Sequence, residues 1–181
     1  MKPRSYTSEG IVLARRSYGE ADRILAVYSK LHGRVSLIAK GARRIRSKKR
    51  GHIEIFNKIS FQAVSGNSLD IMTEAIVIDD LFDLKKNLKK VSLAYYFMEV
   101  IGKITHEGEA NYEVYNILQQ SLQNLKKTKE LKKLRFDFIL RLLTVLGYWP
   151  NGKALPNPDE ELEKVIERNL SSFRVGKILS S

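Results

Sequence analysis

The hydrophobic pattern of this chain changes its period near residues 79–80, and this change limits the possible folds more than any other feature. Before it, short stretches alternate apolar and polar residues, as half-buried β-strands do. After it, apolar residues recur at helical spacing. The sequence therefore predicts an α+β protein with a β domain over residues 1–79 and an all-α domain over residues 80–181.

The β half contains five strand-like stretches. They lie around Ile11 and Leu13, and at 22–29, 34–40, 53–63 and 69–78. Five short strands within about 75 residues, joined by glycine-containing turns, are typical of a small barrel. We expect Val35, Leu37 and Ala39 to face its core, because they share one parity on their strand. The pattern favours an N-terminal five-stranded OB-fold, and an SH3-like barrel is the alternative.

The second half predicts helices at 91–104, 111–125 and 131–146, with Gly147 at the end of the third. Prolines mark 150–158 as an irregular connector. Two short helices are expected near 159–169 and 171–179.

Between the strand stretches at 34–40 and 53–63 lies a run of eleven residues, Lys40 to Arg50, of which seven are basic and none is acidic. The formal net charge of the chain is +12. A loop with this much uncompensated charge favours a polyanionic partner such as nucleic acid. The alternative is a solvated, mobile loop that only aids solubility. The candidate phosphate-binding residues of the run are Lys40, Arg43, Arg44, Arg46, Lys48, Lys49 and Arg50.

Strand parity adds candidates on both sides of this run. Arg34 has the outward parity of the strand before it, and Phe56 and Lys58 have the outward parity of the strand after it. An exposed ring beside a cation suits single-stranded nucleic acid, because bases stack on rings while cations contact phosphates. The alternative for Phe56 is packing in the core or between the domains after a small register slip. Arg15, Arg16 and Arg23 add positive charge near the start of the barrel, and Arg15 and Arg16 could extend the surface or pair with Glu20 and Asp22. A second basic cluster could form another binding patch, or its lysines could only decorate helix ends: Lys126, Lys127, Lys129, Lys132 and Lys133.

Several classes of site lack their residues. The chain has no cysteine, and its three histidines are scattered, so no metal site and no cofactor is expected. Motifs of nucleotide-binding and hydrolytic enzymes are missing, and the acids are too dispersed for a two-metal nuclease. No apolar run approaches the roughly 20 residues that span a bilayer. We expect a cytoplasmic, non-enzymatic binding protein without membrane contact.

Three motifs in order, Glu9-Gly10-Ile11-Val12-Leu13, Tyr18 to Leu25 (YGEADRIL) and Ala39 to Arg44 (AKGARR), resemble the bacterial recombination and repair protein family RecO. The helical stretch that ends in LGYWP also matches the layout of this family. The resemblance covers residues 6–150 well and the last 30 residues weakly.

The resemblance implies an OB-fold followed by a helical domain, and a recombination mediator that binds single- and double-stranded DNA at the nucleoid and promotes strand annealing. Such proteins work with RecR to load RecA onto DNA coated by single-stranded DNA-binding protein, whose C-terminal tail binds the helical domain. Lys40, Arg43 and Arg44 match the basic motif of the family. Many members hold a four-cysteine zinc site where this chain has Pro150 to Pro158. The alternative function is an RNA- or ribosome-associated OB-fold module.

Overall fold

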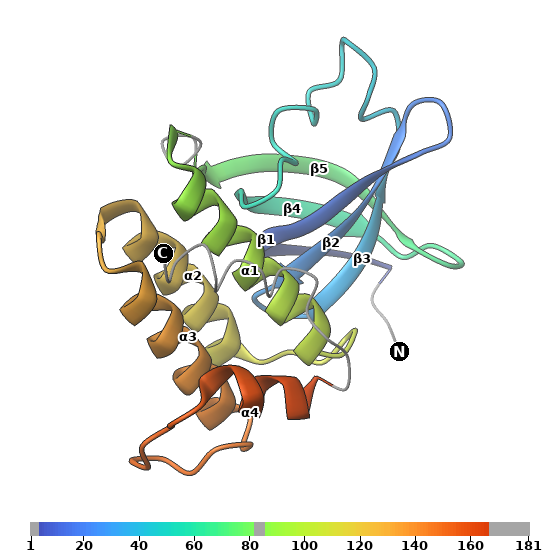
Figure 1. The fold of residues 1–181 in the computed structure, drawn as a ribbon. Coiled ribbons are helices and arrows are strands. Elements are labelled where there is room, and N and C mark those ends of the chain that lie inside the picture. The colour runs from blue at the N-terminus through green and yellow to red at the C-terminus, as the bar shows by residue number, and fades with distance from the viewer. Residues whose placement is uncertain (1–3, 82–85, 167–181) are drawn as a thin grey trace. The chain divides into compact units, whose positions relative to one another are not determined.

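The computed structural model describes residues 4–81 and 86–166. In these residues, five strands form a closed barrel in the order β1-β2-β3-β5-β4, and four helices follow (Figure 1). The strands are β1 (Ser5–Tyr18), β2 (Asp22–Ser29), β3 (Gly33–Ala39), β4 (Lys58–Val64) and β5 (Asp70–Asp79). All neighbours are antiparallel except β3 and β5, which are parallel. This topology is that of an OB-fold, so the predicted fold class is confirmed.

The long strand β1 closes the barrel because it pairs with two neighbours. Its first half pairs with β4 and its second half with β2, and the register shifts between Val12 and Ala14. Gly10 lies where the two pairings overlap. A Cβ atom there would lie 2.5 Å from Cγ1 of Val27, so the strands approach too closely for any larger residue.

On β3 the barrel core follows the predicted alternation, since Leu37 and Ala39 are fully buried and Val35 packs against the core while partly buried. Leu25 and Val27 of β2 are fully buried as well. β2 has the predicted limits, but the predicted strand 53–63 is too long. Residues 51–57 form turns, and β4 begins only at Lys58.

A segment far along the chain packs on the barrel. Residues 105–111, which join the first two helices, and Tyr112 form one compact unit with the described residues 4–80. The Gly108 amide donates to the carbonyl of Arg34 (2.9 Å), and the Ser36 amide donates to the Glu107 carboxylate (3.0 Å). The sequence analysis did not anticipate this insertion, and the domain limits at 79–80 remain a proposal.

The helices are α1 (Leu88–Ile104), α2 (Tyr112–Lys127), α3 (Leu131–Val145) and α4 (Pro158–Val165). Phe97 of α1 and Phe138 of α3 pack with their ring centroids 4.2 Å apart. Gly147 has a φ of +79°, and its amide donates to the carbonyl of Thr144, so it ends α3 as predicted. The predicted helix at 171–179, like residues 167–169 of the one before it, lies outside the described residues. No helix among the described residues is long and apolar enough to cross a membrane.

Candidate nucleic-acid interface

We call residues 40–50 the basic loop. It joins β3 to the turns before β4 and is a succession of tight turns. The Arg44 amide donates to the carbonyl of Gly41 (3.1 Å), and the Ser47 amide donates to that of Arg44 (3.0 Å). Six of its seven basic side chains belong to exposed residues: Lys40, Arg43, Arg44, Arg46, Lys48 and Arg50. The loop therefore presents a dense set of cations to solvent.

The start of the loop is fixed to the hairpin turn between β1 and β2. A carboxylate oxygen of Asp22 accepts a hydrogen bond from the Gly41 amide (2.7 Å). The Arg43 amide donates to the carbonyl of Ala21 (2.8 Å), and its guanidinium donates to that of Gly19 (3.2 Å). In Figure 1 the turn and the loop lie at the same end of the barrel. These bonds hold the loop against the hairpin.

The end of the loop is fixed as well. The side-chain amide of Asn57, a buried residue, donates to the carbonyls of Gly51 and His52. Nδ1 of His52 accepts from the Val77 amide of β5 (3.1 Å). The ammonium group of Lys49 donates to the carbonyl of Met72 (3.2 Å). Lys49 thus ties the loop to β5, and it is the one basic residue of the loop that is not exposed.

The exposed aromatic expected at Phe56 is wrong. The side chain of Phe56 is only 7% exposed, and its φ is +78°. Its amide donates to the carbonyl of Val12 (2.9 Å). Phe56 precedes β4 in a left-handed conformation, so the outward parity of that strand does not extend back to it. The residue is buried, as the alternative that the sequence left open requires.

Arg34 and Lys58 do not join the cluster of exposed cations. Arg34 lies near the start of β3, and the basic loop follows its end, about 20 Å away for a strand of this length. Its guanidinium Nε is buried. The ammonium of Lys58 pairs with the Glu9 carboxylate (3.2 Å). Both stay predictions as DNA contacts.

Arginines near the barrel start have a partner that the sequence analysis missed. Arg15 and Arg23 both contact the carboxylate of Glu54, at 2.7 and 3.4 Å. The sequence left open a pairing of Arg15 with Glu20 or Asp22, whereas the structure pairs Arg15 with Glu54. Glu54 is 39 positions from Arg15, so no local sequence signal points to this pair.

The opposite end of the barrel has a different chemistry. Tyr6, His32 and the carboxylates of Asp70 and Glu107 line a hollow of about 290 Å³. The Tyr6 hydroxyl donates to Asp70 (2.8 Å), and burial, followed by this bond to a carboxylate, raises the pKa of Tyr6. Acids here disfavour phosphate, so the electrostatics of the barrel unit favour the end that carries the basic loop.

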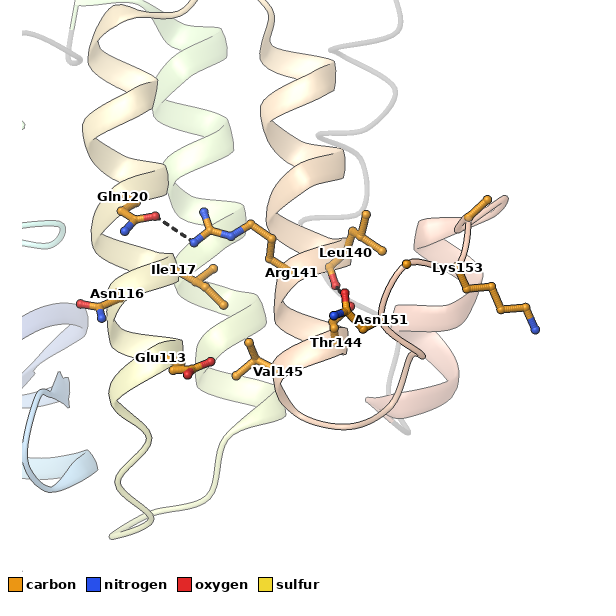
Figure 2. Close-up of a pocket in the computed structure, with 12 residues that line it drawn as sticks. Glu113, Asn116, Ile117, Gln120, Leu140, Arg141, Thr144, Val145, Asn151 and Lys153 are labelled. Atoms are coloured by element: carbon orange, nitrogen blue, oxygen red, sulfur yellow. Dashed lines mark hydrogen bonds between the residues drawn. The ribbon is translucent and has the colours of Figure 1, made fainter.

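The helical unit contains a cavity of about 800 Å³ between α2, α3 and residues 151–154. Figure 2 shows Ile117 of α2 and Leu140 and Val145 of α3 among its lining side chains. Arg141 donates to the side-chain oxygen of Gln120 across this space (2.8 Å). The cavity combines apolar walls with the Arg141 guanidinium and the Glu113 carboxylate, whereas the Lys153 side chain extends away from the others in Figure 2.

A second basic cluster lies at the end of α2 and the start of α3 in the helical unit. The ammonium of Lys90 on α1 donates to the carbonyl of Lys126 (3.0 Å), which brings the start of α1 to the same end. The cluster contains Lys126, Lys127, Lys129, Lys132 and Lys133.

Two family models match the chain in succession. The model of the recombination protein O N terminal matches residues 1–81, and that of the recombination protein O C terminal matches residues 85–154. The chain belongs to the RecO family. Among its relatives is the DNA repair protein RecO of Alkaliphilus metalliredigens, which is 32% identical over 145 residues, or 80% of this chain and 59% of the relative. That of Roseiflexus sp. is 32% identical over 83% of this chain and 53% of the relative. The DNA repair protein RecO of Moorella thermoacetica is 32% identical over 89% of this chain and 60% of the relative. The chain thus spans 53–60% of the length of these relatives.

The RecO family models divide the candidate sites between them. The basic loop lies entirely within the part that matches the N-terminal model. The cavity of the helical unit, from Glu113 to Ala154, lies within the part that matches the C-terminal model. The chain has no cysteine. Among the described residues, no cluster of three or more histidines and acids could hold a metal ion.

Proposed function

We propose that this chain acts in DNA repair as a recombination mediator that binds DNA through the basic loop and promotes strand annealing without catalysing a reaction. One observation carries the proposal: six exposed cations stand on a loop that is held at both ends by hydrogen bonds. The name of the relatives, DNA repair protein RecO, supports DNA as the polyanion. Phosphates of single- and double-stranded DNA are the ligands of the loop.

Further partners are part of the proposal and rest on family membership. They are RecR, single-stranded DNA-binding protein and, indirectly, RecA. We propose that the acidic, apolar tail of single-stranded DNA-binding protein binds the cavity of the helical unit, where Ile117 and Val145 offer apolar contact and Arg141 offers positive charge. An Arg141→Ala variant should weaken binding of a labelled tail peptide and leave DNA binding unchanged.

The salt dependence of DNA affinity tests whether the exposed cations of the basic loop bind phosphates. If the six exposed cations each neutralise one phosphate, the slope of log K against log salt for single strands is about −4. Replacing Lys40, Arg44 and Arg46 by alanine should halve this slope to about −2. Arg43 is left in place because it also holds the hairpin turn. The matched control replaces Lys127, Lys129 and Lys132 in the helical unit, which removes the same charge.

The functional test is strand annealing on DNA coated with the cognate single-stranded DNA-binding protein. Wild type and the control variant should anneal, and the loop variant should not. Equal losses in both variants would show that only net charge matters. Competition with structured RNA separates the alternative function, because an RNA-binding module should prefer RNA through its 2′-hydroxyls.

A further inference from the structure

The most exposed large apolar side chain among the described residues lies within the basic loop. Ile45 is 90% exposed. The Ser47 amide donates to the carbonyl of Arg44 (3.0 Å), which makes residues 44–47 a tight turn with Ile45 at its first central position. Arg44 and Arg46 flank it in sequence, and both are exposed. The turn therefore presents an exposed apolar side chain next in sequence to two exposed arginines.

An aromatic side chain lies at the neighbouring hairpin. Tyr18 ends β1 and is 52% exposed. It directly precedes Gly19, whose carbonyl accepts a hydrogen bond from the Arg43 guanidinium (3.2 Å). The Arg43 amide bonds to the same turn through the carbonyl of Ala21 (2.8 Å). These bonds bring the ring to the end of the barrel that carries the basic loop.

Exposed apolar side chains are common, so exposure alone does not suggest a ligand. The cations of the basic loop, at the same end of the barrel, suggest one. A strand whose phosphates contact the guanidinium groups of the loop has its bases a few ångströms away, and bases offer flat apolar faces. Ile45 is β-branched and stiff at χ1, so it loses little freedom when it becomes buried. Apolar residues of this kind insert between base steps in other DNA-binding proteins.

We propose that Ile45 inserts between bases and that the Tyr18 ring stacks on a base of the single strand whose phosphates the basic loop binds. This inference rests on the proposed function and adds base contacts to its phosphate contacts. Base contacts of this kind are tolerant of sequence, because every base has a face on which a side chain can pack. The proposal replaces the aromatic contact that the sequence analysis assigned to Phe56, whose ring is buried.

The test compares two oligonucleotides that have the same phosphates, an oligothymidine and a strand of abasic sites of equal length. Fluorescence anisotropy gives the affinity of wild type and of the Ile45→Ala and Tyr18→Ala variants. On oligothymidine, each variant should bind about fivefold or more weakly than wild type. On the abasic strand, each should bind as wild type does. Tyr18→Phe should retain full affinity for oligothymidine, since the ring remains.

Leu31→Ala and Tyr148→Ala are matched controls. Leu31, at the turn between β2 and β3, is 60% exposed, and Tyr148, in the helical unit, is 52% exposed. Neither should change binding to either strand. Ile45 and Tyr18 variants that bind oligothymidine like wild type would overturn the inference, and so would equal losses on both strands. Variants that lose a protein partner but keep DNA affinity would also overturn it, in favour of a protein-docking role. Failure of wild type to bind either strand would instead refute the proposed function.

Discussion

Replacing Gly33 by alanine should detach the segment 105–112 from the barrel. Gly33 has a φ of +64°, and an added Cβ would lie 2.0 Å from the carbonyl oxygen of Glu109 and 2.3 Å from its carbonyl carbon. Both are main-chain atoms, so no side-chain rotation relieves the clash. The left-handed conformation alone costs about 1–2 kcal/mol for alanine. Displacing the segment also breaks the Gly108–Arg34 and Ser36–Glu107 hydrogen bonds, each of which stabilises by about 1 kcal/mol. The expected loss is about 3–4 kcal/mol in all.

A second glycine of the same barrel separates the two contributions. Gly19 has a φ of +52°, and an added Cβ would meet nothing within 4 Å. Gly19→Ala should therefore show only the conformational cost, and Gly33→Ala should lose about 2 kcal/mol more. Hydrogen exchange at the Gly108 amide gives the local free energy of opening, and urea denaturation gives the global loss. Equal losses in the two variants, with Gly108 still protected in Gly33→Ala, would refute the reasoning.

Three further variants test the charges and the buried groups. Glu54→Gln removes the carboxylate that holds two arginines, so affinity for single-stranded DNA should rise and the salt slope should steepen by about 0.7 per freed cation; a fall in affinity would contradict this. Burial raises the pKa of Tyr28 from 10.0 to about 12. The unfolded state therefore loses this proton first, and the free energy of unfolding should fall by about 1.4 kcal/mol per pH unit between these two pKa values. Tyr28→Phe should reduce this slope in urea titrations at a series of pH values. The side chain of Arg135 is only 11% exposed and pairs with Asp159. Asp159→Ala removes this partner and should lower the free energy of unfolding by about 3 kcal/mol. Adding Arg135→Met in a double variant should restore most of this loss.

Local patterns predicted much of the fold because they depend on neighbours in sequence. The alternation on β3 placed Leu37 and Ala39 in the core, and the structure confirms both. The predicted start of the third helix at Leu131 and the left-handed Gly147 after it are also confirmed. Each of these features is decided by side chains within a few residues, through strand parity or helix capping.

The misses depend on contacts between distant segments. Phe56 shares the parity of β4, yet it lies before the strand in a left-handed conformation, and its ring is buried. No propensity argument predicts a positive φ at phenylalanine. Likewise, only the pairing of β1 with β4 brings Glu9 to Lys58, and only the turns before β4 bring Glu54 to Arg15. Charge counts from sequence therefore overstate the cations available to a ligand.

The two readings of the basic run differ in what they require of its backbone. A loop that merely aids solubility needs no fixed shape, whereas a phosphate-binding loop gains affinity if its cations are held in place before binding. Asp22 caps the first turn, Asn57 and His52 fix the last turn, and the Lys49 ammonium donates a hydrogen bond to a carbonyl of β5. These contacts order the backbone on which six cations remain exposed. Because ordering a loop of like charges costs entropy and brings repelling groups together, its fixed shape favours the binding role over the solvated one.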